Sequence, residues 1–325
     1  MSNRKITVKK ALLVLIAAAV MLAAVPAFAN YPAPKPVPAL GNNIRTNMTL
    51  VQRSQLGYTG TKRYSISSYG GETVYSDFVR RELMKKGRVF PVDTEHILWC
   101  SEFATWCARR AGTYADYFYP CRDTDEFRVR FARMNCYWVL SNNVGNTYPE
   151  CITAAKGKVM SVSQLRNGDI LQIRRSGSGN SKVHHTGTVE SVANGRVVVS
   201  LDGNSGNKAQ RVSYSISEIK GVIRPLYAKK LTLTVKKKNS KTAQLTWTAV
   251  NDDRIVARVY RREAGTSRWQ HLYNVRANER RYVDSTRKQG KKYSYRIVLH
   301  TISGHRFFVV KDINGKNVDS TTNYI

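Results

Sequence analysis

In this 325-residue chain, the residues that most clearly suggest chemistry surround a cysteine, in the run Trp99-Cys100-Ser101-Glu102-Phe103. The run predicts a helix that begins at Cys100 and ends at a cap on Gly112. A thiol at a helix N-terminus lies at the positive end of the helix dipole, which favours the nucleophilic thiolate. The N–H groups of Cys100 or Ser101 at that terminus are candidate donors to an oxyanion. These residues predict nucleophilic attack on a carbonyl carbon.

A thiolate hydrolase also needs a general base, which histidine commonly supplies. His184 and His185 begin a predicted strand that extends to residue 192. Alternation along a strand sends the two rings to opposite faces, and His185 shares its face with the bare Gly187. We therefore favour His185 as the base, with His184 as the alternative. The other histidines are poorer candidates by position: His96, His271, His300 and His305.

A third group must orient the imidazole by accepting its other N–H. The predicted strand over 196–201 is followed by Asp202-Gly203-Asn204-Ser205-Gly206. Asp202 and Asn204 are two residues apart, so they project to one side while the strand lasts. Either could hold the histidine. The alternative interpretation of the same residues is a simple turn, because Asp-Gly and Asn-Ser-Gly are common turn sequences.

Together with Asn167-Gly168-Asp169-Ile170 and His185-Thr186-Gly187, these motifs resemble the CHAP family of cysteine, histidine-dependent amidohydrolases and peptidases. The resemblance spans residues 71–225 and implies a papain-like α+β domain, with N-terminal helices followed by an antiparallel sheet. It implies an enzyme that cleaves a peptidoglycan amide, as an N-acetylmuramoyl-L-alanine amidase or an endopeptidase. Cys100 would be the nucleophile, His185 the base, and Asp202 the orienting acid with Asn204 assisting. The chain departs from the family where Asp202 replaces the usual glutamate.

The first 29 residues have the composition of a secretory signal peptide. Four cations precede an apolar run over 11–24, and Ala29 ends a cleavage signal. The run is shorter than the roughly 20 residues that a transmembrane helix needs. We therefore predict a secreted or wall-associated protein without a membrane span after cleavage. A proline-rich linker over 30–50 is expected next, and then the hydrolase domain over 51–227.

Residues 228–325 predict a second domain, a β-sandwich of short strands separated by turn signals. Its aromatic positions, including Trp247 and Tyr293-Ser294-Tyr295, resemble a fibronectin type III domain. This segment carries 22 Lys and Arg against 7 Asp and Glu, within a chain of formal net charge +31. Such a charge predicts an anionic cell-wall polymer as partner. No nucleic-acid motif accompanies it, so nucleic acid is not expected.

Five cysteines in an exported chain suit one free thiol and up to two disulfides. If Cys100 is free, the pairing of the others stays open: Cys107, Cys121, Cys136 and Cys151. No CxxC pair or His/Cys ligand spacing is present, so we expect no metal and no cofactor, and a monomer. A different class of function stays open beside the enzyme, a basic wall-binding or adhesion protein on a lapsed hydrolase fold. Acyl transfer by the same Cys–His pair is a further alternative.

Overall fold

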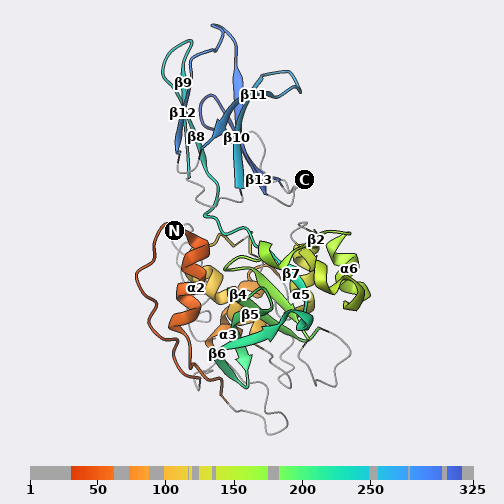
Figure 1. Ribbon diagram of the computed structural model, residues 1–325. Helices are drawn as coiled ribbons and strands as arrows, with labels where there is room; N and C mark the ends of the chain where they lie inside the picture. Colours follow the sequence, from red (N-terminus) through yellow and green to blue (C-terminus); the bar gives the residue numbers. More distant parts are fainter. Residues whose placement is uncertain are drawn as a thin grey trace, which may run out of the picture.

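The structure is a computed structural model that describes residues 31–61, 73–87, 99–115, 117–118, 124–133, 137–174, 183–248, 255–276, 279–301 and 306–316. The predicted signal peptide, His96, His305, Cys121 and Cys136 lie outside these residues. Figure 1 shows a lower part in which helices cover a sheet and an upper part built of strands alone. The architecture is α+β with several sheets, followed by a β-sandwich.

Five α-helices are described in the lower part. They are α2 (Ile44–Ser54), α3 (Val74–Met84), α4 (Cys100–Arg110), α5 (Thr124–Arg133) and α6 (Pro149–Ala155). The side chain of Thr73 caps α3 by accepting from the N–H of Ser76, as threonine commonly does at this position. Helix α4 is buried from Cys100 through Ala108, so it forms the centre of the helical layer rather than a solvated face.

The sheet has seven strands in the order β2-β1-β7-β3-β4-β5-β6. Their bounds are β1 Tyr137–Leu140, β2 Val159–Met160, β3 Ile170–Ile173, β4 His185–Ala193, β5 Val197–Ser205, β6 Lys208–Ser215 and β7 Ile219–Ile223. Every pairing is antiparallel except that of β1 with β2. Three 3-10 turns connect these elements: Ser141–Asn146, Val162–Gln164 and Ile216–Glu218.

Strand β5 is longer than the sequence predicts. It continues through Asp202 and Gly203 to Ser205, and the chain reverses only at Gly206 and Asn207, whose φ angles are +60° and +58°. Positive φ at both central residues is typical of the two-residue hairpin turn that matches strand twist. The turn interpretation is therefore wrong for Asp202-Gly203, which is part of a strand, whereas Gly206 does lie in the turn.

The proline-rich segment differs from a free linker over 30–50, because helix α2 begins at Ile44. The preceding residues lie against the folded domain. The amide of Gln55 accepts from the N–H of Lys35 and donates to its carbonyl, and the Tyr58 hydroxyl donates to the carbonyl of Pro32. Residues 31–43 thus form a strap along α2. Helix α2 itself contributes Ile44, Met48 and Val51 to the core of the lower part.

The sandwich has two antiparallel sheets, β11-β10-β13-β14 and β12-β9-β8. The strands are β8 Leu233–Lys237, β9 Ala243–Trp247, β10 Ile255–Glu263, β11 Gln270–Val275, β12 Arg281–Asp284, β13 Tyr293–Thr301 and β14 Arg306–Asp312. The core of the sandwich continues into the lower part, where it includes Tyr117 and Leu226. The Tyr117 hydroxyl accepts from the N–H of Leu231, so the two parts meet across a packed junction.

Candidate active site

Cys100 is the first residue of α4, and its side chain is buried. The residue before it fixes the position of the helix end. The indole Nε1 of Trp99 donates to Oδ1 of Asn207 at 3.1 Å, and Asn207 lies in the β5–β6 turn. Because Trp99 is fully buried and Trp106 is 2% exposed, both rings pack the helix and neither lines a groove. The thiol is therefore held at a fixed place beside β5.

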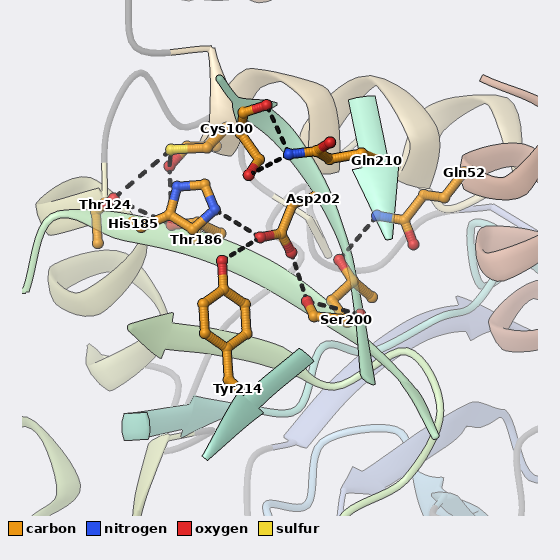
Figure 2. Close-up of polar contacts among 12 residues, drawn as sticks. Gln52, Cys100, Thr124, His185, Thr186, Ser200, Asp202, Gln210 and Tyr214 are labelled. Carbon is orange, nitrogen blue, oxygen red and sulfur yellow. Dashed lines mark hydrogen bonds and ion pairs between the residues drawn. The ribbon is translucent and has the colours of Figure 1, made fainter. Parts of the chain in front are cut away.

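His185 is the first residue of β4 and lies opposite Ile173 of β3. Its imidazole and the Cys100 thiol form a side-chain hydrogen bond. The ring atom Nε2 lies 2.8 Å from Oδ2 of Asp202, which leaves Nδ1 to face the sulfur (Figure 2). The preceding His184 lies outside the strand, with its N–H donating to the carbonyl of Ile173 at 3.3 Å. Of the two neighbouring histidines, the structure brings His185 to the thiol.

Asp202 lies behind the imidazole with a fully buried side chain. Three groups surround its carboxylate. Besides His185, the hydroxyl of Tyr214 donates to Oδ2 at 2.5 Å and the hydroxyl of Ser200 donates to Oδ1 at 2.6 Å. A buried carboxylate is tolerated only when such donors replace its water shell. These contacts keep the acid in a single orientation toward the ring (Figure 2).

Gly187 makes this arrangement possible. A Cβ at this position would collide with Oγ of Ser200 and Oδ1 of Asp202. The space beside the bare Gly187 is filled by the two side chains that hold the acid.

Asn204 does not share the place of Asp202. The pairing of β5 with β6 shifts between Asp202 and Ser205, and Asn204 has φ +56° within this bulge. A bulge interrupts the alternation of side chains, so residues two apart no longer project together. Oδ1 of Asn204 is buried without a hydrogen-bond partner. The group beside the imidazole is Asp202, and an assisting role for Asn204 has no recorded contact.

Electrostatics in the Cys100–His185–Asp202 cluster favour charge separation. Burial lowers the pKa of His185, but the charge and hydrogen bond of Asp202, together with Cys100, outweigh burial and raise this pKa to about 9. Burial raises the pKa of Cys100, but the hydrogen bond and charge of His185 outweigh it and bring the thiol below its ordinary value. Both shifts favour a thiolate beside an imidazolium at neutral pH.

Hydroxyl groups, in addition to the imidazole, lie near the Cys100 sulfur. Oγ of Ser101 and Oγ1 of Thr124 each lie 4.0 Å from the Cys100 sulfur. Oγ1 of Thr186 joins them, at 3.2 Å from Ser101 and 3.1 Å from Thr124. We call Ser101, Thr124 and Thr186 the hydroxyl cluster. A thiolate buried among such dipoles retains polar contacts that water would otherwise supply.

The N-terminus of α4 also provides backbone donors. The first helical hydrogen bond runs from the N–H of Phe103 to the carbonyl of Trp99 at 2.9 Å. The N–H of Ser101 precedes this bond and belongs to the group that a helix leaves outside its own ladder. Its use as an oxyanion donor stays a prediction, and the side chain of Ser101 belongs to the hydroxyl cluster.

Sequence reasoning missed four polar side chains near Cys100, His185 and Asp202. They are Thr124, Thr186, Ser200 and Tyr214. Ser200 was identifiable, because it lies two residues before Asp202 on the same strand and therefore on the same face. Tyr214 lies in β6, opposite Val198 of β5. Thr124 is the first residue of α5, far in sequence from the motifs. No local signal could have identified either residue, since both depend on how distant segments pack.

Cys100, Cys107 and Cys151 are buried, and none of the three forms a disulfide. Two disulfides among the five cysteines are therefore excluded. Cys107 lies on α4 within the core, and burial raises its pKa well above the ordinary value. This thiol is a packing residue, whereas Cys100 on the same helix has a histidine beside it.

Within the described ranges, no three His, Cys, Asp or Glu side chains gather as a metal site would require. None of the helices described is long and apolar enough to cross a bilayer.

No known family profile matches the sequence, and no curated protein matches it. Among solved structures, pectate lyase Pel3 from Pectobacterium carotovorum is similar at 13% identity and a TM-score of 0.25, over 29% of each chain. A chain of a cytokine receptor complex is similar at 11% identity and a TM-score of 0.21, over 42% of this chain and 76% of that one. The chain thus spans under a third of the pectate lyase. Likeness at these scores bears on neither fold nor function.

Proposed function

We propose that this protein is an exported cysteine hydrolase that cleaves an amide bond of peptidoglycan. The observation that carries the proposal is the Cys100 thiol hydrogen-bonded to His185, whose Nε2 lies 2.8 Å from a buried Asp202. Nucleophile, base and orienting acid are the three groups that thiolate hydrolysis requires, in the order in which they must touch. The antiparallel sheet behind a buried helix supports a papain-like fold for this domain.

Acylation begins with attack of the Cys100 thiolate on the amide carbonyl carbon. The resulting oxyanion lies at the N-terminus of α4, where the N–H of Ser101 is a candidate donor. The His185 imidazolium then gives its proton to the leaving amine nitrogen as the carbon–nitrogen bond breaks. The products of this step are a thioester on Cys100 and a free amine.

Deacylation reverses the roles of the imidazole. Neutral His185 removes a proton from water, whose oxygen attacks the thioester carbon. Breaking the carbon–sulfur bond releases a carboxylic acid and returns the thiolate, and the proton taken from water stays on His185. Asp202 supports both steps by holding the ring orientation and stabilising its charged form.

Mass spectrometry of wall fragments is the deciding experiment. Digestion of purified peptidoglycan by the wild-type chain should create new amines and carboxylates without new reducing sugar ends. New muramic acid carboxyls free of peptide would indicate the amidase, and new amines on fragments whose stem peptides stay attached to muramic acid would indicate the endopeptidase. Cys100→Ala should abolish both, as should alkylation of the thiol. Fragments that appear equally with Cys100→Ala, or new reducing ends, would contradict the proposal.

A second candidate is a basic wall-binding protein without catalysis. The burial of the site favours it, because Cys100 is 2% exposed and His185 5% exposed. Under this alternative, wild type and Cys100→Ala would bind walls equally and neither would release fragments. If fragments appear and an added primary amine is incorporated into them, the acyl group of the thioester is transferred to that amine rather than to water, and the Cys100 thiolate is released.

A further inference from the structure

The outer surface of the sheet β11-β10-β13-β14 carries a cluster that the proposed catalysis does not use. Alternation on β10 buries Ala257 and Val259 and turns Arg258, Tyr260 and Arg262 outward. Arg296 of β13 pairs opposite Tyr260, and Trp269 precedes β11. We call the set Arg258, Tyr260, Arg262, Trp269 and Arg296 the basic face. Figure 1 shows β10, β11 and β13 together in the upper part.

Aromatic rings hold two of these cations in place. The Arg296 guanidinium lies between two rings, 4.4 Å from the centroid of Trp269 and 4.8 Å from that of Tyr260. Arg262 lies on Trp269 as well, at 4.7 Å. Stacking orders a guanidinium by its face and leaves its N–H edge for oxygen acceptors. The side-chain entropy that a ligand contact would cost is thereby lost before binding.

Two carboxylates lie on the described strands of this sheet, one on each side of it. Glu263 follows Arg262 on β10 and therefore points to the other side of the sheet, where it pairs with Lys291 at 2.7 Å. Asp312 ends β14 on the side of the basic face, in register with Arg262 through Ser294. Its Oδ1 accepts from the N–H groups of Asn314 and Lys316 within a turn.

A neighbouring arginine shows what a structural role looks like in this domain. Arg261 is buried on the core side, where it pairs with Asp284 at 2.9 Å and lies 4.7 Å from the Tyr293 ring. Arg258, by contrast, is exposed, and no ion pair is recorded for Arg258 or Arg262 within the described part of the chain. Arginines thus occupy opposite surfaces of one sheet, and the inner one, Arg261, has its charge neutralised by Asp284.

We propose that the basic face binds a phosphate-bearing polymer of the cell wall and holds the hydrolase against its substrate. Arg258 and Arg262 are four residues apart on β10, about 13 Å along the strand, and Arg296 lies on β13 opposite the intervening Tyr260. The three guanidiniums can therefore contact successive anionic groups of an extended chain. The choice of a wall polymer rests on the proposed function, while the preference for a repeated anion rests on the charge and geometry of the face alone. Tethering would raise the local substrate concentration.

The second sheet of the sandwich supplies a matched control. Its outer surface carries Lys236 and Arg281, and Lys238 follows β8 on the same alternation. No aromatic stack is recorded for these cations among the described residues. A triple variant there removes as much charge as one on the basic face. Lys236→Gln with Lys238→Gln and Arg281→Gln therefore tests net charge, and Arg258→Gln with Arg262→Gln and Arg296→Gln tests the face.

Binding is measured on the full chain carrying Cys100→Ala, so that the walls stay intact. The probes are purified walls that retain their phosphate polymer and the same walls after its extraction. The face variant should bind intact walls about tenfold more weakly than the parent, and the control less than about threefold, because oriented contacts contribute more than screened charge. Arg258→Glu alone, at an exposed position outside the stacks, should weaken binding even if the triple variant unfolds.

Several outcomes would overturn the proposal. These are equal loss in the face and control variants, equal affinity of the parent for extracted walls, or tighter binding to duplex DNA or to anionic lipid vesicles than to intact walls. Hydrolysis is scored separately, by release of fragments from extracted walls by the chain that keeps Cys100. A failure of the basic face is thus distinguishable from a failure of the catalytic proposal.

Discussion

The hydroxyl of Tyr214 donates to the same Asp202 oxygen that lies 2.8 Å from Nε2 of His185. The tyrosine comes from β6, the acid from β5 and the histidine from β4. Three adjacent strands therefore meet at one oxygen atom, and the orientation of the base depends on the register of all three. The same carboxylate receives Ser200 on its second oxygen.

Tyr214→Phe removes one donor and keeps the ring. Hydrogen bonds to charged groups contribute about 1.5–3 kcal/mol, so we expect kcat/KM to fall about tenfold or more through poorer positioning of the imidazole. Wall-fragment release gives the rate, and binding to intact walls should be unchanged. Activity at the wild-type level would show that Ser200 alone holds the acid.

Asp202→Asn should be far more damaging than Asn204→Ala. The amide cannot stabilise the imidazolium, so the pKa of His185 should fall from about 9 and kcat should drop by about 10² to 10⁴. Asn204→Ala removes a side chain whose Oδ1 has no partner, so we expect kcat to stay within about threefold of wild type. A larger loss in Asn204→Ala than in Asp202→Asn would assign the orienting role to the amide.

Activity should decline as pH rises through about 9. The leaving amine takes its proton from imidazolium, and His185 loses that proton above its raised pKa. The sign follows from the direction of the shift, because a raised histidine pKa keeps the proton bound up to higher pH. On the acidic side, the pH–activity profile should fall where the thiolate becomes protonated. This fall should lie below the ordinary thiol pKa, because the pKa of Cys100 is lowered. The pair titrates as a unit, so the kcat/KM profile should be bell-shaped with no fall between pH 7 and 8.

Thr124→Val tests the hydroxyl cluster while preserving side-chain shape. Loss of a hydroxyl 4.0 Å from the sulfur should raise the thiol pKa, which is measured as the pH dependence of Cys100 alkylation. Thr124→Ser keeps the hydroxyl and should restore the wild-type profile. An unchanged alkylation profile in Thr124→Val would limit this residue to packing.

Gly187→Ala should destabilise the fold and the site together. The added methyl would collide with Ser200 and Asp202, and such overpacking costs about 1–3 kcal/mol. Denaturant unfolding and fragment release measure the two effects. Gly145→Ala is the control, because nothing lies within 4 Å of a Cβ at that position. Equal stability of the two variants would mean that the acid can move aside.

The reactive trio could be anticipated because each member carries a local signal. A cysteine preceded a helical pattern, a histidine began an alternating strand, and Asp202 followed the next strand. The bulge at Asn204 could not be anticipated, since it depends on the pairing of β5 with β6. No individual element is predicted above for residues 137–160, where the structure has β1, β2 and α6. Short elements in an aromatic-rich region lack the periodicity that identifies longer ones.

The expected linker over 30–50 includes the first part of helix α2, which begins at Ile44, because four prolines lie shortly before it. Proline fixes the φ angle of its own residue and still allows the strap to pack against the domain. The side-chain amide of Gln55 then forms hydrogen bonds with the backbone N–H and carbonyl of Lys35. Composition predicted the extended conformation of this segment, whereas its attachment depends on residues that follow it in the chain.

The packed junction around Tyr117 has a practical consequence for anyone who would shorten this protein. Removing the strands after residue 227 would uncover Tyr114 and Tyr117 and withdraw the N–H of Leu231 from the Tyr117 hydroxyl. The truncated chain would then expose an apolar patch a short distance along the chain from the end of α4. The C-terminal sandwich therefore completes part of the core of the lower part.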